Sequence, residues 1–338
     1  MTGAGAGGAG AARLVCVGEA LIDLMAVEAD TPLSEAGTFV RAAGGAPANV
    51  AVGAARLGVR SAFLGKVGAD PFGDHLVATL AAAGVDTGLV ARDAEARTGL
   101  AFVSRHQGER EFLFYRSPAA DQRLRVAEVD EESIAHADVL HHGSLSLAVS
   151  PAREATLHAA AVAGRAGVLR SLDVNLRLDC WSSEGEARRA VLAAAAASEI
   201  VKVSEEELDF LAAGEAGTAG KVIAGLMGEA TRLLVVTRGA AGASYYLTAN
   251  AGLAVGHVPG FAVDALDTTG AGDAFVAGLL TGILADRAAL TDPTALEAVV
   301  RRANACGAIA TTRLGAIPAL PTAAELTAFL ARLSVTAT

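Results

Sequence analysis

The sequence predicts an α/β protein whose core is a mainly parallel sheet. Short apolar runs alternate with alanine-rich helical stretches, and strands separated by helices indicate βαβ units. Hydrophobic residues make up 52% of the chain and charged residues 19%, a balance that permits a sizeable core. A length of 338 residues predicts about two structural units, or one large α/β domain with an appendage.

The strands of the main sheet are expected at the short apolar runs. These lie at Leu14–Val17, 62–64, 139–142, 168–173, 200–203 and Leu233–Thr237. A helix is predicted over residues 48–57, where Gly58 stops it. The following helix has three boundary signals, which are Asp70 as a cap, Pro71 in the first turn and Gly84 after the last turn.

An appendage is predicted by two segments that break this alternation. Residues 21–41 have extended, turn-rich character, and residues 99–115 predict a hairpin whose turn lies at 106–109. The hairpin contains four of the chain's fourteen Phe, Tyr and Trp residues. We interpret the segments at about 21–41 and 97–118 as a lid, with an ordinary edge hairpin as the alternative.

Composition excludes several classes of partner. The net charge is −10, so the chain lacks the basic excess of a nucleic-acid-binding protein, and no nucleic acid partner is expected. No stretch offers about 20 predominantly apolar residues, so no membrane association is expected. Three widely spaced cysteines argue against a disulfide framework and fit a cytoplasmic protein. Residues 1–12 are expected to form a disordered tail before a domain at 13–330.

The strongest functional motif is DTTGAGDAFVAGLL at residues 267–280. Gly270, Ala271 and Gly272 precede a helical run, where backbone N–H groups and the helix dipole favour an anion. Asp273 follows at once, and a carboxylate beside an anion site suits a base that takes a proton from a hydroxyl attacking a phosphoryl group. The alternative is that Asp273 only complements the helix dipole; the order GAGD favours the base.

A second motif, GGAPAN, opens the helix predicted at 48–57. Gly44 and Gly45 permit close approach of the backbone to a ligand, and Asn49 adds donors and acceptors that suit hydroxyl groups. Asp23, at the end of a strand in GEALIDL, is expected to accept hydrogen bonds from a polyol. A glycine-rich turn with a helix cap is the alternative.

Polar residues also follow later strands. Asp173, Asn175 and Arg177 lie just past a predicted strand, at the carboxyl edge where open α/β sheets bind ligands. The TRGAAG sequence forms another turn after a strand, which suits a nucleotide phosphate or ribose. Its candidate residues are Thr237, Gly239 and Gly242.

The segment KVSEEEL allows two interpretations. Ser204 can cap a helix with Glu207 three residues later, which is the pattern of a capping box. The functional interpretation makes Glu207 a carboxylate that reaches magnesium through water. Lys202, in the same segment, also follows a strand.

Together these residues resemble the ribokinase-like (pfkB) carbohydrate kinases. The sequences GGAPANVAVGAARLG and DTTGAGDAFVAGLL are similar to the two signatures of that family, and the second is highly specific. The resemblance extends from about residue 14 to residue 321. Within the family the chain looks most like the fructokinases, through EFLFYRSPAAD, SLDVNLRLDCW, VKVSEEEL and NACGAIATTRLGAIPALP.

The resemblance implies a Rossmann-like αβα sandwich with a mainly parallel central sheet and a small β-sheet lid. It implies ATP as the phosphoryl donor and Mg²⁺ as the metal, and it allows K⁺ as a further cation. The lid often mediates dimers in this family, so a homodimer through the lid is expected.

The resemblance also assigns residues by matching positions. Asp273 would be the base and Gly270–Gly272 the anion hole. The residues facing the sugar would be Asp23, Gly44, Gly45, Asn49, Arg116, Asn175 and Arg177. Those along ATP would be Lys202, Thr237, Gly239, Gly242 and Asn304. Glu207 would reach Mg²⁺ through water, and backbone around Asp264 and Gly315 would hold a monovalent cation. Ser204 stands where many relatives have Asn, which weakens the metal role of Glu207.

We therefore predict an ATP-dependent sugar kinase that converts D-fructose to fructose 6-phosphate. Within the family, 2-keto-3-deoxygluconate, another sugar or a nucleoside is the alternative substrate, because Arg116 and Arg177 suit a carboxylate as well as hydroxyls. Outside enzymes, the alternative is a non-catalytic sugar-binding or regulatory protein, against which the intact GAGD sequence argues.

Overall fold

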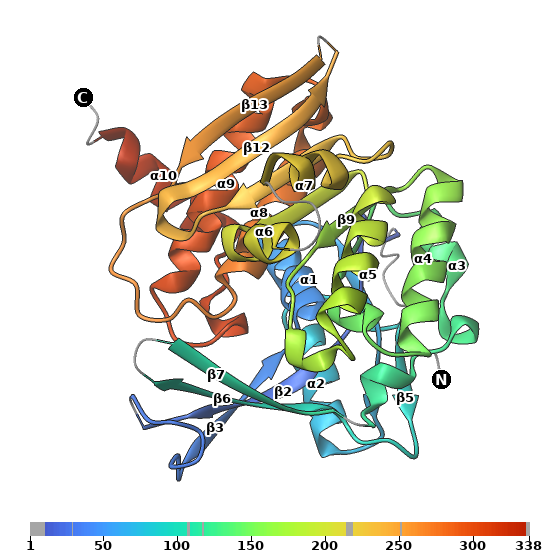
Figure 1. The fold of residues 1–338 in the computed structure, drawn as a ribbon. Coiled ribbons are helices and arrows are strands. Elements are labelled where there is room, and N and C mark those ends of the chain that lie inside the picture. The colour runs from blue at the N-terminus through green and yellow to red at the C-terminus, as the bar shows by residue number, and fades with distance from the viewer. Residues whose placement is uncertain are drawn as a thin grey trace, which may run out of the picture.

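A large, mainly parallel sheet forms the centre of the molecule. The computed structural model describes residues 11–28, 30–106, 109–116, 118–213, 219–250 and 252–335. Across these residues, nine strands form this sheet in the order β13-β12-β11-β10-β9-β8-β1-β4-β5 (Figure 1). The strands from β11 to β5 are parallel, and β12 and β13 add an antiparallel edge. The predicted fold class is confirmed.

The strands of this sheet are β1 (Leu14–Val17), β4 (Ser61–Gly68), β5 (Val90–Asp93), β8 (Val139–Gly143), β9 (Leu169–Asp173), β10 (Ile200–Ser204), β11 (Leu233–Thr237), β12 (Gly242–Ala249) and β13 (Gly252–Pro259). Six of them lie where the sequence predicts a strand and differ from the prediction mainly at their ends, whereas β5, β12 and β13 were not among the predicted strands. The largest difference is in β4, which runs four residues beyond the predicted end because residues 65–68 pair with β5. Gly65 and Lys66 interrupt the apolar run there and hid this extension.

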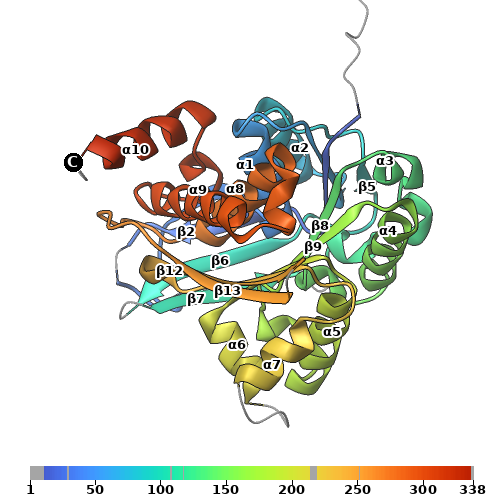
Figure 2. The ribbon, with the colours of Figure 1, turned by 90° about the horizontal axis from the view of Figure 1, so that it is seen from above.

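Helices cover both faces of the sheet (Figure 2). One face packs on α1 (Ala46–Arg56), α8 (Ala271–Ala285) and α9 (Pro293–Thr311). The other packs on α4 (Ala152–Ala166), α5 (Glu184–Ala196), α6 (Glu205–Ala212) and α7 (Ala219–Leu226). The remaining helices are α2 (Pro71–Ala82), α3 (Glu131–Ala135) and α10 (Ala323–Val335). The result is the αβα sandwich that was expected.

The first two helices follow their local signals. Helix α1 begins two residues before its predicted start, because Gly45 is its cap and Pro47 lies in its first turn. Helix α2 begins as predicted, with Asp70 accepting hydrogen bonds from the N–H groups of Phe72 and Gly73.

The appendage is a second, separate sheet rather than a hairpin on the main one. It has the order β3-β2-β6-β7 and projects from one end of the sandwich (Figure 1). Its strands are β2 (Leu21–Ala26), β3 (Phe39–Gly44), β6 (Leu100–His106) and β7 (Glu109–Tyr115). Strand β2 pairs in parallel with β6, so the hairpin joins the earlier segment instead of the main sheet. Periodicity alone does not reveal such a long-range pairing.

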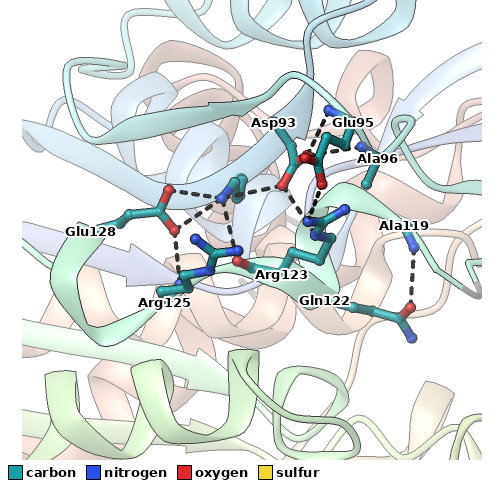
Figure 3. Close-up of polar contacts among 9 residues, drawn as sticks. Asp93, Glu95, Ala96, Ala119, Gln122, Arg123, Arg125 and Glu128 are labelled. Carbon is teal, nitrogen blue, oxygen red and sulfur yellow. Dashed lines mark hydrogen bonds and ion pairs between the residues drawn. The ribbon is translucent and has the colours of Figure 1, made fainter.

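The chain after the small sheet is tied to the main sheet by the Lys66 cluster, which consists of Lys66, Asp93, Arg123 and Glu128. Figure 3 labels Asp93, Arg123 and Glu128 of this cluster. Lys66 Nζ lies 2.8 Å from Glu128 Oε1 and 3.3 Å from Asp93 Oδ2. Arg123 Nε lies 3.4 Å from the same Asp93 oxygen. This cluster joins β4 and β5 to the short 3₁₀ turns that follow β7.

Some expectations fall on parts that the structure does not describe. Residues 1–10 of the predicted tail and residues 107–108 of the hairpin turn lie outside the described residues. Within the described ranges, none of the helices is long and apolar enough to cross a membrane.

Candidate active site

A polar cavity of about 240 Å³ opens beyond the carboxyl ends of β1, β8, β9 and β10. It is lined by predicted site residues from widely separated motifs, namely Asp23, Gly45, Asn49, Asn175, Arg177, Lys202, Gly270, Gly272 and Asp273. Phe112 and Phe114 of β7 complete its wall. The small sheet therefore contributes directly to this cavity.

Asp273 lies in the first turn of α8 and is almost completely buried. Its Oδ2 accepts a hydrogen bond from Asn49 Nδ2 at 2.8 Å, which fixes the carboxylate toward α1. Burial raises the pKa of Asp273, whereas the Asn49 hydrogen bond and the charges of Lys202 and Arg177 lower it. The group is thus a buried carboxylate that is oriented by an amide.

The start of α8 presents backbone donors beside Asp273. Gly270 caps the helix with a φ of 75°, a conformation that glycine adopts without strain. The Ala271 N–H donates to Thr268 O at 3.2 Å, while Gly272 and Asp273 occupy first-turn positions whose N–H groups have no helical acceptor. Backbone donors at this position favour an anion.

Lys202 adds a positive charge at the same place. A Cβ added to Gly272 would lie 3.5 Å from Lys202 Nζ, so the ammonium group is next to the start of α8. Lys202 is buried and pairs with Asp173 across β10 and β9, at an Nζ–Oδ1 distance of 3.0 Å.

The glycine pair packs against Asp23. A Cβ at Gly44 would collide with the Asp23 carboxylate, and Gly45 has a φ of 107°. The pKa of Asp23 is raised to about 7, chiefly by burial and also by the nearby charge of Asp273, against the lowering effect of Arg177. The absence of a side chain at Gly44 therefore leaves room for the Asp23 carboxylate, whereas Gly45 lines the cavity itself.

The loop after β9 brings Asn175 and Arg177 to the wall of the polar cavity. Asn175 has a φ of 34°, a left-handed conformation that asparagine tolerates better than most residues. The Arg177 guanidinium lies 5.5 Å from the centre of the Phe112 ring, so this arginine contacts the small sheet.

An apolar cavity of about 500 Å³ lies on the other side of the α8 N-terminus. Among its walls are the predicted residues Thr237, Gly239, Gly242 and Asn304, together with Phe261 and Phe275. Thr268 and Gly272 line both the polar and the apolar cavity. The two cavities therefore meet where Asp273 and the backbone donors of α8 lie.

Asn304 holds the backbone at the wall of the apolar cavity by hydrogen bonds. Its Nδ2 donates to Val258 O at 3.0 Å and to Pro259 O at 3.1 Å. Both amide hydrogens are used within the protein, so Asn304 positions the segment that leads to Phe261.

The structure gives Glu207 the capping role. Its Oε2 accepts the Ser204 N–H at 2.8 Å, and its N–H donates to Ser204 Oγ at 3.2 Å. Its Oε1 accepts the Leu176 N–H at 2.7 Å. In the part of the chain that the structure describes, no group of three His, Cys, Asp or Glu residues is arranged to hold a metal ion.

Gly315 and Arg116, both assigned through the resemblance, are each bound by an aspartate of the same chain. The Gly315 N–H donates to Asp267 Oδ2 at 2.9 Å, and Asp267 Oδ1 accepts from Thr269 N–H at 2.9 Å. Asp267 thus connects the GAGD loop to Gly315, and Asp264 is exposed. A monovalent cation at the backbone around Asp264 and Gly315 stays a prediction. Arg116 is not among the described residues that line either cavity. Its side chain is buried against Asp121.

Sequence reasoning missed Glu19, which lines the polar cavity directly after β1. Its Oε1 accepts the Ala46 N–H at 3.0 Å, at the start of α1. Glu19 stands in the GEALIDL sequence and lies beyond a strand end, the same signal that identified Asp173.

Residues 11–323 match the pfkB family carbohydrate kinases, and the chain belongs to this family. It is a sugar phosphotransferase. The chain is 48% identical over 318 residues to a probable fructokinase-4 of Arabidopsis thaliana, covering 94% of this chain and 96% of the relative.

Solved structures agree with this assignment. A fructokinase of Xylella fastidiosa with bound ATP has a TM-score of 0.87 and 39% identity, covering 95% of this chain and 98% of that one. A fructokinase of Vibrio cholerae O395 in a form that binds fructose, ADP and calcium ion has a TM-score of 0.82 and 38% identity, covering 94% and 99%.

Proposed function

We propose that the protein is an ATP-dependent fructokinase, which converts D-fructose and ATP to fructose 6-phosphate and ADP. The observation that carries this proposal is the meeting of the polar and apolar cavities at the start of α8, beside Asp273. A phosphoryl group has to pass between two bound substrates, and such a junction is where it would do so. The fructokinase names of the relatives support fructose as the acceptor.

The polar cavity is the proposed sugar site. Asp23 and Asn49 would bind hydroxyl groups, and the backbone at Gly45 permits close approach of the sugar. Asp273 would accept the proton of the attacking hydroxyl, because its carboxylate is buried and held by Asn49 at 2.8 Å. Proton transfer to a positioned base contributes typically about 10²–10⁴-fold to a rate.

Charge on the transferring phosphoryl group would be stabilised at the start of α8. The N–H groups of Gly272 and Asp273 and the positive end of the helix dipole point to the same region. Lys202 Nζ lies beside Gly272 and would add a full positive charge there.

The apolar cavity is the proposed ATP site. Thr237, Gly239 and Gly242 line its phosphate end, while Phe261 and Phe275 form an apolar wall for the base. Mg²⁺ usually keeps several waters and is bound by one or two carboxylates plus substrate phosphates. Asp173 lines the polar cavity and fits such water-mediated contact, and the ion would neutralise phosphate charge. Glu207 fits it less well, because both of its carboxylate oxygens accept backbone N–H groups and it lines neither cavity among the described residues. A K⁺ site near Gly315 stays a prediction.

The small sheet is the proposed lid. Phe112 and Phe114 reach the polar cavity from β7, so closure of this sheet would exclude water from the sugar site. Val40, Leu113 and Tyr115 of the same sheet are exposed, with 59%, 49% and 61% of their surfaces accessible. These apolar side chains would form the contact of a homodimer.

A coupled ADP-release assay over a panel of sugars, sugar acids and nucleosides tests this function. We expect the highest kcat/KM with D-fructose, and phosphate on the 6-hydroxyl of the product. A clear preference for a sugar acid or a nucleoside would refute fructose as the substrate. Absence of turnover with every member would favour the non-catalytic alternative.

A further inference from the structure

Three buried side-chain oxygens of residues that line the polar cavity have neither a hydrogen-bond nor an ion-pair partner among the described residues. They are Glu19 Oε2, Asn49 Oδ1 and Ser144 Oγ. Leaving a buried polar atom unpaired costs free energy, so such atoms in native proteins usually bind a protein group, an ordered water or a ligand. Asn49 already orients Asp273 through its amide nitrogen, whereas Ser144 and Glu19 Oε2 have no role in the site so far.

Ser144 directly follows β8 and is completely buried. It precedes the short 3₁₀ turn Leu145–Leu147, where a serine side chain commonly caps the turn. Here the side chain makes no such bond; only the carbonyl of Ser144 takes part, by accepting the Leu147 N–H at 2.9 Å. Capping therefore does not explain the hydroxyl group, which belongs to a residue of the cavity wall.

Glu19 leaves the main sheet at the same level as Ser144. Strands β1 and β8 are parallel neighbours in which Val17 pairs with His142, and Glu19 and Ser144 each lie two residues beyond this pair. Glu19 Oε1 accepts the Ala46 N–H at 3.0 Å, so Oε2 is the oxygen that remains for a ligand. The two groups are complementary, because a carboxylate oxygen only accepts a hydrogen bond and a serine hydroxyl also donates one.

We propose that Glu19 and Ser144 together bind one hydroxyl group of the sugar, whose hydrogen is donated to Glu19 Oε2 and whose oxygen accepts from Ser144 Oγ. The inference rests on the proposed fructokinase function and deepens it by adding a positioning pair to the sugar site. The hydroxyl bound by this pair is not the reacting one, because the attacking hydroxyl is assigned to Asp273. The pair thus orients the sugar from the strand ends of the main sheet.

Ser144→Ala tests the pair, because it removes only the hydroxyl group. Loss of one hydrogen bond should raise the KM for fructose about threefold to tenfold and leave kcat within about twofold, as expected for binding that is equal in the ground and transition states. Ser146→Ala is the matched control. Ser146 is also buried with an unpartnered Oγ, yet it lines neither cavity in the described part of the chain, so its KM should equal that of the wild type.

Fructose analogues identify the hydroxyl group that the pair binds. The panel is 1-deoxy-, 3-deoxy- and 4-deoxy-D-fructose and 2,5-anhydro-D-mannitol, each of which lacks one hydroxyl group and keeps the reacting one. For one analogue, its KM divided by that of fructose should fall in Ser144→Ala from about threefold to tenfold to about one, because the protein partner is already missing.

Glu19→Gln should lower the ratio for the same analogue. Glutamine keeps an acceptor for the Ala46 N–H and places an NH₂ group where Oε2 lies, so the sugar hydroxyl loses its acceptor. The comparison is made at pH 8, because burial raises the pKa of Glu19 to about 7, against the lowering effect of Arg116, and the wild-type carboxylate is then mostly ionised.

An unchanged fructose KM in folded Ser144→Ala would overturn the inference, and it is the result expected if only a water lies between the two side chains. Different analogues responding in the two variants would overturn it as well. If Ser144→Ala did not fold, an unchanged analogue profile in Glu19→Gln would contradict the pair. Failure of the proposed function is a separate result, since it would appear as absent fructose turnover in the wild-type protein.

Discussion

Two buried lysines lie on strands of the same sheet, and the aspartates that pair with them have pKa values shifted in opposite directions. Lys66 pairs with Asp93 at 3.3 Å, and Lys202 pairs with Asp173 at 3.0 Å. The pKa of Asp93 is lowered to about 2, chiefly by the Ala96 N–H and also by Lys66. The pKa of Asp173 is raised to about 6, because burial outweighs the effect of Lys202. Similar ion pairs thus favour an ionised carboxylate in one place and disfavour it in the other.

The difference separates a structural ion pair from a functional one. Asp93 is held by backbone N–H groups as well as by a lysine, so its charge is fully supported. Around Lys202, the charges of Glu207 and Asp273 raise the pKa of Asp173 further. An excess of negative charge in a protein core lowers stability, and such an excess is typical of binding and catalytic sites. We expect changes at Lys66 to alter stability and changes at Lys202 to alter turnover.

The largest effect in this comparison is expected from Lys202→Met. Removing a preorganised positive group beside the phosphoryl transfer site should lower kcat by about 10²–10³-fold. Stability should change little, because Asp173 can become protonated when its partner is lost. Steady-state kinetics and urea unfolding measure both quantities, and a destabilised variant with normal turnover would reverse the assignment.

The reciprocal effect is expected from Lys66→Met. The variant leaves Asp93 without its buried partner, which typically costs about 3–5 kcal/mol of unfolding free energy. Turnover per folded molecule should stay within about twofold of the wild type, because Lys66 does not line either cavity within the described residues. Urea unfolding with an activity assay checks this, and a folded, stable but inactive variant would contradict it.

The pH dependence of kcat/KM gives a smaller, directional test. Asp273 has to be ionised to accept a proton, so activity is lost as pH falls through its pKa, which burial raises above the ordinary aspartate value. The Asn49 hydrogen bond lowers that pKa. The acid limb should therefore move to higher pH in Asn49→Ala. A limb that stays in place would show that Asn49 does not tune the base.

Sequence could locate the parts of the site that are local in the chain. Gly270, Gly272 and Asp273 are neighbours, so one motif defined their arrangement at the start of α8. Glu207 shows the limit of this reasoning, because a capping box and a metal ligand share one pattern. Only the structure shows that its carboxylate accepts two backbone N–H groups, from Ser204 and Leu176.

Contacts between residues that are far apart in the chain could not be predicted from the sequence. The resemblance places Lys202 along ATP, but the local sequence reveals neither lysine's partners, because the side chains that surround them come from other strands and loops. Arg116 was expected at the sugar, yet Asp121, only five residues later, holds it inside. The pairing of β2 with β6 likewise depends on packing between segments about 80 residues apart, which periodicity does not encode.

The central claim, that Asp273 is the base at the junction of two substrate sites, is tested most directly by Asp273→Asn. The amide keeps the shape of the side chain but accepts a proton far less readily. We predict that kcat with fructose and ATP falls by about 10²–10⁴-fold, while fructose binding measured by calorimetry and the unfolding midpoint are retained. Turnover equal to that of the wild type would contradict the account.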